Sequence, residues 1–348
     1  MTEIDSTSAI LETLPLAGPP WPTPDPFLFC AYHDDHYPAG ESHLGPKPEH
    51  LKGRRIGMDF EGIGGWRMYH GEAIPGFPAH PHRGFETVTI VRRGFIDHAD
   101  SLGATARFGE GDVQWLTAGA GIVHCEMFPL LQRDAENPLE LFQIWLNLPK
   151  KNKLVDPHFS MLWSETLPRA SVKDDAGRVT DVTVIAGNYA NEPAPPSPPP
   201  SSWANAAEND VAIWTLRLDP GARFTLPKSR RGEEGGIRTL YFFVGTTLNV
   251  EDTTFDKPTA VILDPSKDVT LEAGATEVEI LMLQGRPIGE PIAQHGPFVM
   301  NTAAEIQQTM LDYRRTRFGG WPWPNDEPVH PRERGRFAKH ADGRIEER

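Results

Sequence analysis

Two stretches, HPHRGFETVTIV (residues 80–91) and GIVHCEM (residues 121–127), determine how this chain is interpreted. The first places His80 and His82 two positions apart, and the second does the same for His124 and Glu126. Side chains two positions apart on a strand point to the same face of a sheet. Two short strands could therefore bring three imidazoles and one carboxylate to a single divalent metal ion. Iron, manganese, nickel, copper and zinc all accept that set of ligands.

The composition limits what surrounds this site. The chain has 348 residues, enough for about two domains, and a formal net charge of -14, which argues against nucleic acid or an anionic membrane as a partner. Its two cysteines, Cys30 and Cys125, are too few for a disulfide framework and indicate a reducing compartment. No basic segment precedes an apolar run at the N-terminus, so we expect a cytoplasmic protein.

Runs of β-branched and aromatic residues, each of strand length, recur in two blocks of the chain. In the first block they cover residues 85–91, 113–116 and 141–146, with a further strand beginning at Ile96. In the second block they cover residues 182–185, 213–218, 239–244 and 278–283. Many short strands with glycine-rich turns are typical of a sandwich or a small barrel. We therefore predict an all-β chain that uses one architecture twice.

The segments between and around the blocks suggest domain limits. We expect a proline-rich N-terminal arm at residues 1–50, a metal-binding barrel at 51–160, a second barrel at 161–295, and a helix and tail at 296–348. The proline run 195–200 is either a linker or a long surface loop of the second block. Thr302 and Glu305 have the spacing of a capping box and predict one amphipathic helix, followed by a loosely held tail.

A second cluster of possible ligands lies in the N-terminal arm. His33, Asp34, Asp35 and His36 are of the right residue types for a second metal site. Such clusters in turn-rich segments are more often solvated, and we favour that interpretation here.

Longer motifs connect the chain to a known family. Residues 80–88, 111–115, 117–119 with His124 and Glu126, and 294–302 (QHGPFVMNT) resemble the signatures of the pirins. The resemblance implies a bicupin, that is, two cupin-type β-barrels with a C-terminal α-helix, in which only the N-terminal barrel holds one divalent ion, Fe(2+). The second barrel agrees with this, because no histidine lies between His158 and His295.

The resemblance also assigns the site residues. It makes His80, His82, His124 and Glu126 the metal ligands, whereas the general cupin pattern would offer Glu86 as the carboxylate ligand instead. We prefer Glu126 because it shares a strand face with His124. Glu86 has the same parity as His80 and His82 and could still lie near the metal without binding it. Two neighbouring histidines, His70 and His98, could line the cavity, although we expect structural roles for them. Strand alternation points the Cys125 side chain away from the site, so we expect it to pack in the core.

Two functions follow from the resemblance. The first is a quercetin 2,3-dioxygenase that acts on a flavonol with dioxygen, Glu126 serving as the catalytic acceptor of the hydroxyl proton. We expect Phe77, Phe85, Trp115 and Phe142 to line an apolar cavity for this small aromatic substrate. The alternative is a non-enzymatic, redox-responsive metal-binding protein that regulates a protein partner.

Overall fold

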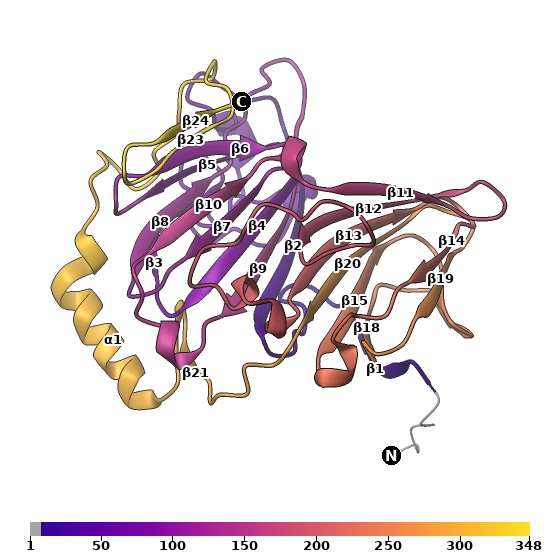
Figure 1. The fold of residues 1–348 in the computed structure, drawn as a ribbon. Coiled ribbons are helices and arrows are strands. Elements are labelled where there is room, and N and C mark those ends of the chain that lie inside the picture. The colour runs from indigo at the N-terminus through magenta and orange to yellow at the C-terminus, as the bar shows by residue number, and fades with distance from the viewer. Residues whose placement is uncertain (1–7) are drawn as a thin grey trace. The chain divides into compact units, whose positions relative to one another are not determined.

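The computed structural model describes residues 8–348, and its strands form two compact units (Figure 1). We call the first the histidine unit; it consists of Ala31–Ser164 and Glu290–Arg348. Among the described residues, the second unit consists of residues 8–30 together with Glu165–Gly289. Each unit is built mainly from two sheets, and the strand pairs described below are antiparallel. The prediction of an all-β chain in which one architecture is used twice is therefore confirmed.

The histidine unit contains a sheet of five strands, one of six strands and a small hairpin. The five strands, in spatial order, are β10 (His158–Leu162), β7 (Val113–Thr117), β4 (Phe85–Arg93), β9 (Asn137–Asn147) and β2 (Phe27–Tyr37). The six strands are β24 (Ile345–Glu347), β23 (Phe337–Lys339), β6 (Thr105–Gly109), β5 (Phe95–Asp100), β8 (Ile122–Met127) and β3 (Gly76–His82). The hairpin pairs β21 (Ala293–His295) with β22 (Phe298–Met300).

The second unit contains a sheet of seven strands and one of four. The seven strands, in spatial order, are β1 (Ile10–Pro15), β18 (Thr259–Leu263), β15 (Ile237–Val244), β20 (Val278–Gly285), β13 (Ala212–Leu218), β12 (Val179–Ala186) and β11 (Arg169–Lys173). The four strands are β14 (Arg223–Leu226), β19 (Val269–Ala273), β16 (Leu248–Val250) and β17 (Thr253–Phe255). Short 3-10 helices occur in the connections of both units, at 48–51, 63–65, 150–152, 164–166, 203–205, 207–209, 232–234 and 317–319.

Each unit buries one apolar core between its two sheets. In the second unit, Leu240 and Ile280 of the larger sheet pack with Phe224 of the smaller one. In the histidine unit, Phe108 and Leu116 come from opposite sheets and are also buried together. Burying a side chain of this size stabilises the fold by about 1.5–3 kcal/mol. Alternating apolar residues in the strands supply these contacts, which is why the sequence predicted the central strands correctly.

Residues 8–50 do not form a separate arm, and residues 1–7 of the predicted arm lie outside the described part of the chain. β1 pairs with β18 over residues 10–15, and β2 joins the five-stranded sheet beside β9. Prolines between residues 19 and 26 do interrupt regular structure, but the strands lie on either side of them. Residues 8–30 belong to the second unit, and residues 31–50 belong to the histidine unit.

The proline run is a loop rather than a linker between units. Residues 195–200 lie between β12 and β13, which are neighbours in the seven-stranded sheet of the second unit. Of the two possibilities left open by the sequence, the structure therefore supports the long surface loop.

The predicted helix is α1 (Ala303–Thr316), and it packs on the histidine unit. Its capping residue Thr302 accepts a hydrogen bond from the backbone N–H of Glu305, as the capping-box spacing predicted. Ile306 of α1 is buried with Phe298 and with Val123 of β8. No helix within residues 8–348 is long and apolar enough to span a membrane.

The tail that follows α1 is not loosely held. β23 pairs with β6, placing Phe337 opposite Arg107 and Lys339 opposite Thr105. Arg107 is almost fully buried, and its guanidinium donates to the backbone carbonyls of Pro331 (2.9 Å) and His330 (3.0 Å). The polar composition of the tail suggested disorder because its partner, a buried arginine more than 200 positions away, is not visible in the local sequence.

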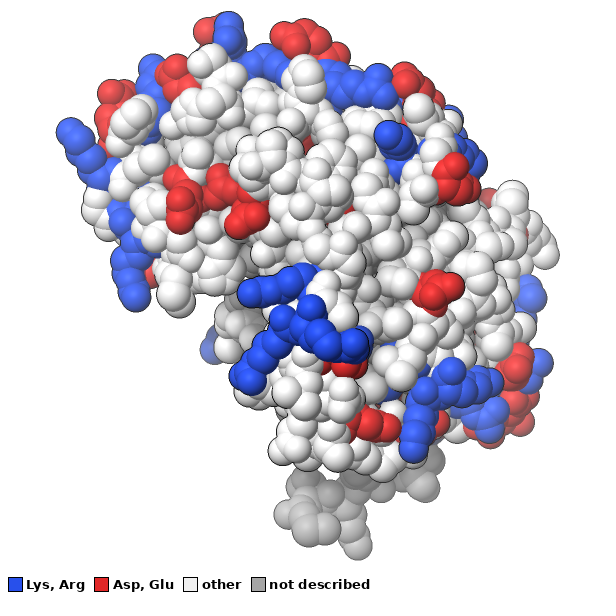
Figure 2. All heavy atoms as spheres, turned by 90° about the vertical axis from the view of Figure 1, so that its left-hand side faces the viewer, with Lys and Arg blue, Asp and Glu red and all other residues white. Residues whose placement is uncertain are grey.

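Charged side chains are mixed on the surface of the face that carries α1. Figure 2 shows small groups of Lys and Arg flanked by Asp and Glu, so that neither sign forms a continuous field. The basic last turn of α1, with Arg314 and Arg315, contributes to this face.

Candidate metal centre

Strands β3 and β8 bring the two predicted ligand pairs together. In their antiparallel register His80 lies opposite His124, and His82 lies opposite Ile122. Nearer the start of β3, Phe77 lies opposite Glu126. Between this pair and the pair of His80 and His124, β3 therefore has one residue more than β8. This β-bulge turns both Phe77 and His80 to the inner face, although they are an odd number of positions apart.

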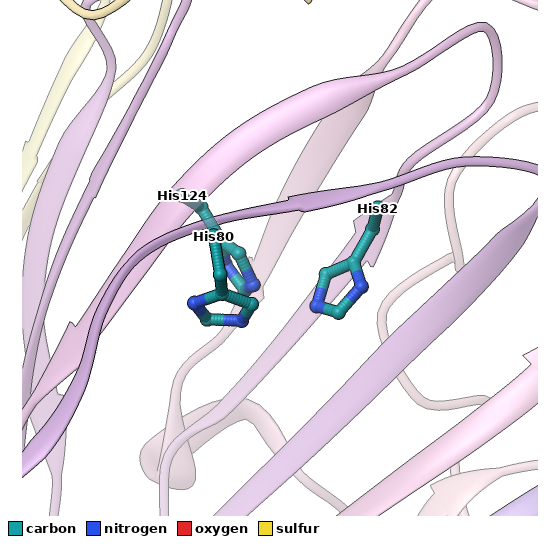
Figure 3. Close-up of side chains that lie close together, drawn as sticks. All are labelled: His80, His82 and His124. Atoms are coloured by element: carbon teal, nitrogen blue, oxygen red, sulfur yellow. The ribbon is translucent and has the colours of Figure 1, made fainter. Parts of the chain in front are cut away.

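The three histidines converge on one point. One ligand nitrogen from each of His80, His82 and His124 lies within 4.8 Å of the other two (Figure 3). Their ring centroids are 4.5 to 4.9 Å apart. Within residues 8–348 this is the single group of three or more such side chains close enough to hold a metal ion.

The environment keeps these imidazoles neutral, which is the form that binds metals. Burial lowers the pKa of His80 to about 4 and holds the pKa values of His82 and His124 well below the ordinary value. Nδ1 of His80 lies 2.8 Å from the carbonyl oxygen of Pro78, which fixes the proton there and leaves Nε2 as the lone-pair donor. Neither ring nitrogen of His124, a buried residue, has a hydrogen-bond partner within the described part of the chain. Buried polar atoms without partners are costly, so this donor set fits a divalent ion.

Glu126 lies beside the histidines but outside their group. Its Oε2 is 4.0 Å from Nε2 of His124. The hydroxyl of Thr89 donates to Oε1 (3.1 Å) and the amide of Gln143 donates to Oε2 (2.9 Å). Burial raises the pKa of Glu126, while these two hydrogen bonds oppose the rise. The carboxylate is thus held in one orientation next to the imidazoles.

Thr89 and Gln143 were missed in the sequence. They lie opposite each other on β4 and β9, and both are polar residues on the inner faces of largely apolar strands. A polar residue in an apolar strand could have marked each of them as a site candidate. Their hydrogen bonds to Glu126, however, depend on strand pairing, which the local sequence does not predict.

Glu86 is placed differently from Glu126. It accepts a hydrogen bond from the Thr117 hydroxyl at 2.6 Å, and it is an odd number of positions from Thr89 on an unbroken stretch of β4. Alternation therefore points Glu86 to the opposite face of the strand from the one that contacts Glu126. The structure gives Glu86 no place beside the three histidines.

His98 lies closer to the site than expected. It is buried on β5 opposite Glu126, and its ring centroid is 5.5 Å from that of His124. Its Nε2 is 3.4 Å from a carboxylate oxygen of Asp100. His98 thus adds a fourth imidazole to the inner face, whereas His70 is exposed at the rim of the neighbouring cavity.

Cys125 packs away from the site. It is buried with Ala99 and Met127 on the other face of β8, where Trp323 of the tail covers them. Burial raises the pKa of its thiol, so the group is a neutral thiol in the core. The expectation of a packing role is confirmed.

The cluster at residues 33–36 does not form a second site. β2 turns Asp35 inward, where it accepts a hydrogen bond from the Tyr69 hydroxyl (2.6 Å) and pairs with Arg67 (3.0 Å). Asp34 and His36 are exposed on the other face of the strand, 3.7 Å from each other. Strand alternation separates the four side chains, so they do not form a metal site. The expectation of a solvated, turn-rich segment holds only for Asp34 and His36, because the segment is a strand and Asp35 is fully buried.

A cavity of about 1020 Å³ leads to His80. Phe77 lines it, and the tail forms one wall through residues 323–330. Phe85 lies next to His82, with ring centroids 5.1 Å apart. The other two predicted aromatics are not beside the histidines.

Trp115 and Phe142 were placed wrongly by the sequence. They lie opposite Val88 and Ile90 of β4, on the face of that strand that points away from Thr89. The tryptophan that does lie beside the histidines is Trp145, whose ring centroid is 5.5 Å from that of His82. Which face of a buried strand points to the site cannot be read when both faces are apolar.

Comparison with known proteins identifies the family. The family model described as Pirin matches residues 23–146, and the model described as Pirin C-terminal cupin domain matches residues 213–319. A Pseudomonas aeruginosa protein named "Putative quercetin 2,3-dioxygenase PA2418" is 36% identical over 244 residues, which cover 70% of this chain and 79% of that protein. Human pirin is 34% identical over 260 residues, covering 70% of this chain and 78% of its own.

A solved structure agrees with these matches. The crystal structure titled quercetin 2,3-dioxygenase from Acinetobacter baumannii has a TM-score of 0.65 and 28% identity, covering 85% of this chain and 87% of that one. The predicted fold class, two cupin domains with a C-terminal helix, is therefore confirmed. The chain belongs to the pirin family.

Proposed function

We propose that this chain is an iron-dependent dioxygenase that acts on a flavonol such as quercetin. The observation that carries the proposal is the convergence of His80, His82 and His124, which are held neutral by burial beside a cavity. The names of the Pseudomonas relative and of the Acinetobacter structure give the reaction class.

The proposed ligands are the three histidines and Glu126, in the histidine unit alone. A bound iron(II) ion would supply open coordination positions for the flavonol oxygens and for dioxygen. We assign Glu126 the role of accepting the flavonol hydroxyl proton, because its Oε2 lies next to His124. Thr89 and Gln143 hold the carboxylate in place, which reduces the rearrangement needed before proton transfer.

The cavity suits a flat aromatic substrate. Its volume of about 1020 Å³ is at the upper end of the range of roughly 300–1,000 Å³ usual for small-molecule sites. Phe77 offers an aromatic surface beside His80, with ring centroids 6.3 Å apart. The backbone N–H of Ala79 is bonded to the carbonyl of Asp326, so the tail wall is joined directly to the ligand strand.

The test is turnover by protein loaded with iron(II). Loss of quercetin absorbance should accompany oxygen uptake in a fixed ratio, and H82A should abolish both. H295A is the matched control, since His295 is exposed in the same unit and lies outside the histidine group, and it should retain activity. If the loaded protein binds quercetin without consuming oxygen, the dioxygenase proposal fails. A non-enzymatic metal-binding protein that acts on a protein partner would then be the better explanation.

A further inference from the structure

We propose that the second unit binds a small organic carboxylate, with Arg238 as the group that pairs with the anion. A pocket of about 540 Å³ lies at one end of the core of this unit, and Arg238 and Gln284 form part of its lining. The pocket is formed entirely by residues of the second unit, so the proposal does not depend on the proposed dioxygenase activity.

Arg238 points inward on β15. It shares a strand face with Leu240 and Phe242, which are both members of the apolar core, and it is only 1% exposed. Its Nε donates to Oε1 of Gln284 (2.7 Å) and its Nη1 donates to the carbonyl of Pro227 (2.8 Å). Both acceptors are neutral, so these hydrogen bonds satisfy donors without compensating the charge.

The guanidinium has no carboxylate partner within the described residues, 8–348, at salt-bridge distance. Two acidic residues act on Arg238 through their charge alone: Asp210, whose Oδ2 already accepts the hydroxyl of Ser229, and Asp268. Burial lowers the pKa of Arg238 to about 10, which still leaves it charged at neutral pH. Buried charges are normally paired, because an unpaired one is costly. An anionic ligand would supply the missing partner.

The charge of the pocket favours an anion. Its lining includes Lys228, Arg230 and Arg238, and the one acidic residue among the lining residues is Asp210. The whole chain carries a formal net charge of -14, so this local excess of positive charge runs against the general trend. A cleft lined with one sign of charge attracts ligands of the other sign.

The remaining wall favours an organic anion over an inorganic one. Tyr189 and Trp214 line the pocket with their rings nearly perpendicular and 5.3 Å apart. The indole N–H of Trp214 donates to the carbonyl of Ala186 (3.2 Å), which leaves its apolar ring surface for contact. Pro195 and Pro198 of the proline run add further apolar surface. The pocket therefore combines one buried cation with a wall for a hydrocarbon body.

The experiment is calorimetric titration of the metal-loaded full chain with acetate, succinate and benzoate. Benzamide serves as the neutral analogue of benzoate, and inorganic phosphate serves as the inorganic anion. At least one carboxylate should bind saturably, and R238Q should weaken that binding by about tenfold or more. R217Q is the matched control, because Arg217 is exposed on the same sheet and pairs with Asp181 and Glu277; it should bind like the parent.

A second measurement uses the unaltered protein, in case R238Q does not fold. Hydrogen exchange with and without the bound carboxylate should show protection in residues 186–190, 194–198 and 227–230, which line the pocket. The proposal is overturned if none of the three carboxylates binds, if benzamide or phosphate binds as tightly as the best carboxylate, or if the protection lies in another part of the chain. Unchanged affinity in a folded R238Q protein would overturn it as well.

Discussion

His80 lies directly opposite His124 across β3 and β8, with the two ring centroids 4.5 Å apart. Two of the three imidazoles are therefore positioned by a single strand pairing. A slip of one residue in this register would turn one of the two strands so that its inner side chains faced outward. The backbone hydrogen bonds of one strand pair thus control the geometry of the whole centre.

Removing a ligand histidine should remove the metal. We expect H124A to lose the ion and, with it, the stabilisation that a ligand bound only by the folded state provides. Elemental analysis should give one metal per chain for the parent protein and close to none for H124A. The increase in thermal midpoint on adding iron(II) should disappear in the variant. H36Q, which changes an exposed histidine, should behave like the parent. Two ions per parent chain, or full occupancy in H124A, would rule out the assigned site.

Replacing Glu126 should harm metal binding and turnover more than replacing Glu86. E126Q preserves shape but removes the negative charge beside His124, and we expect a loss of about 10- to 100-fold in affinity or rate. E86Q alters a carboxylate that is bonded to Thr117 on the other face of β4. Metal dissociation constants and oxygen-uptake rates of the two variants provide the comparison. If E86Q is the more damaging change, the general cupin pattern is right and Glu126 is not the carboxylate ligand.

Weakening the hydrogen bonds between Arg107 and the tail should widen the cavity, because the tail forms one of its walls. Arg107 binds Asp97 through two hydrogen bonds (2.6 and 2.7 Å) and also holds carbonyls of residues 330–334. R107K keeps the charge but cannot make all of these contacts at once, because Lys lacks the planar fork. We expect faster hydrogen exchange in residues 321–339 and a raised KM for quercetin. The control is R217Q, which removes an exposed pairing with Asp181 in the second unit. Unchanged exchange in R107K would show that other contacts hold the tail.

Acid should destabilise the fold partly through His33. Its Nδ1 lies 2.7 Å from the Tyr69 hydroxyl, and burial lowers its pKa to about 4. The unfolded chain takes up a proton near pH 6.5 and the folded one only near pH 4, so stability falls as the pH is lowered through that interval. H33Q should flatten this slope in urea-unfolding midpoints measured in steps from about pH 7.5 to about pH 4.5.

Asp35 changes the stability of the fold over the same pH range, but in the opposite direction. Burial raises the pKa of Asp35 to about 6, so its contribution to stability decreases as the pH rises toward that value. His33 and Asp35 both contact the Tyr69 hydroxyl, so the difference between the parent and H33Q reports on His33 together with any change that it causes at Asp35. The exposed His36 provides the control variant H36Q, which should keep the slope of the parent. An H33Q slope equal to that of the parent would mean that His33 does not titrate as its burial implies.

The sequence predicted the parts of the site that depend on short-range alternation. His80 with His82, and His124 with Glu126, share faces because each pair lies on one strand. Cys125 points away for the same reason, and the capping box of Thr302 is equally local.

What the sequence could not give depends on partners far along the chain. Gln143 reaches Glu126 only through the pairing of β9 with β4, and the bulge near Phe77 appears only once β3 meets β8. Trp115 and Trp145 are equally apolar candidates until the inner face of each sheet is known. The tail looked disordered because its buried partner, Arg107, lies in the first half of the chain.

Residues 323–330, which form one wall of the cavity, are synthesised after the strands that carry the three histidines. The ligand strands β3 and β8 have left the ribosome long before residues 323–330, which close one side of their cavity. During synthesis the second unit is completed first, while the histidine pocket still lacks Trp323 and its hydrogen bond to the carbonyl of Asp100 (2.8 Å). A histidine unit without residues 323–330 would have a wider opening at His80, because these residues line the cavity there. We expect a metal ion to reach the three histidines more easily in such a chain than in one that carries these residues.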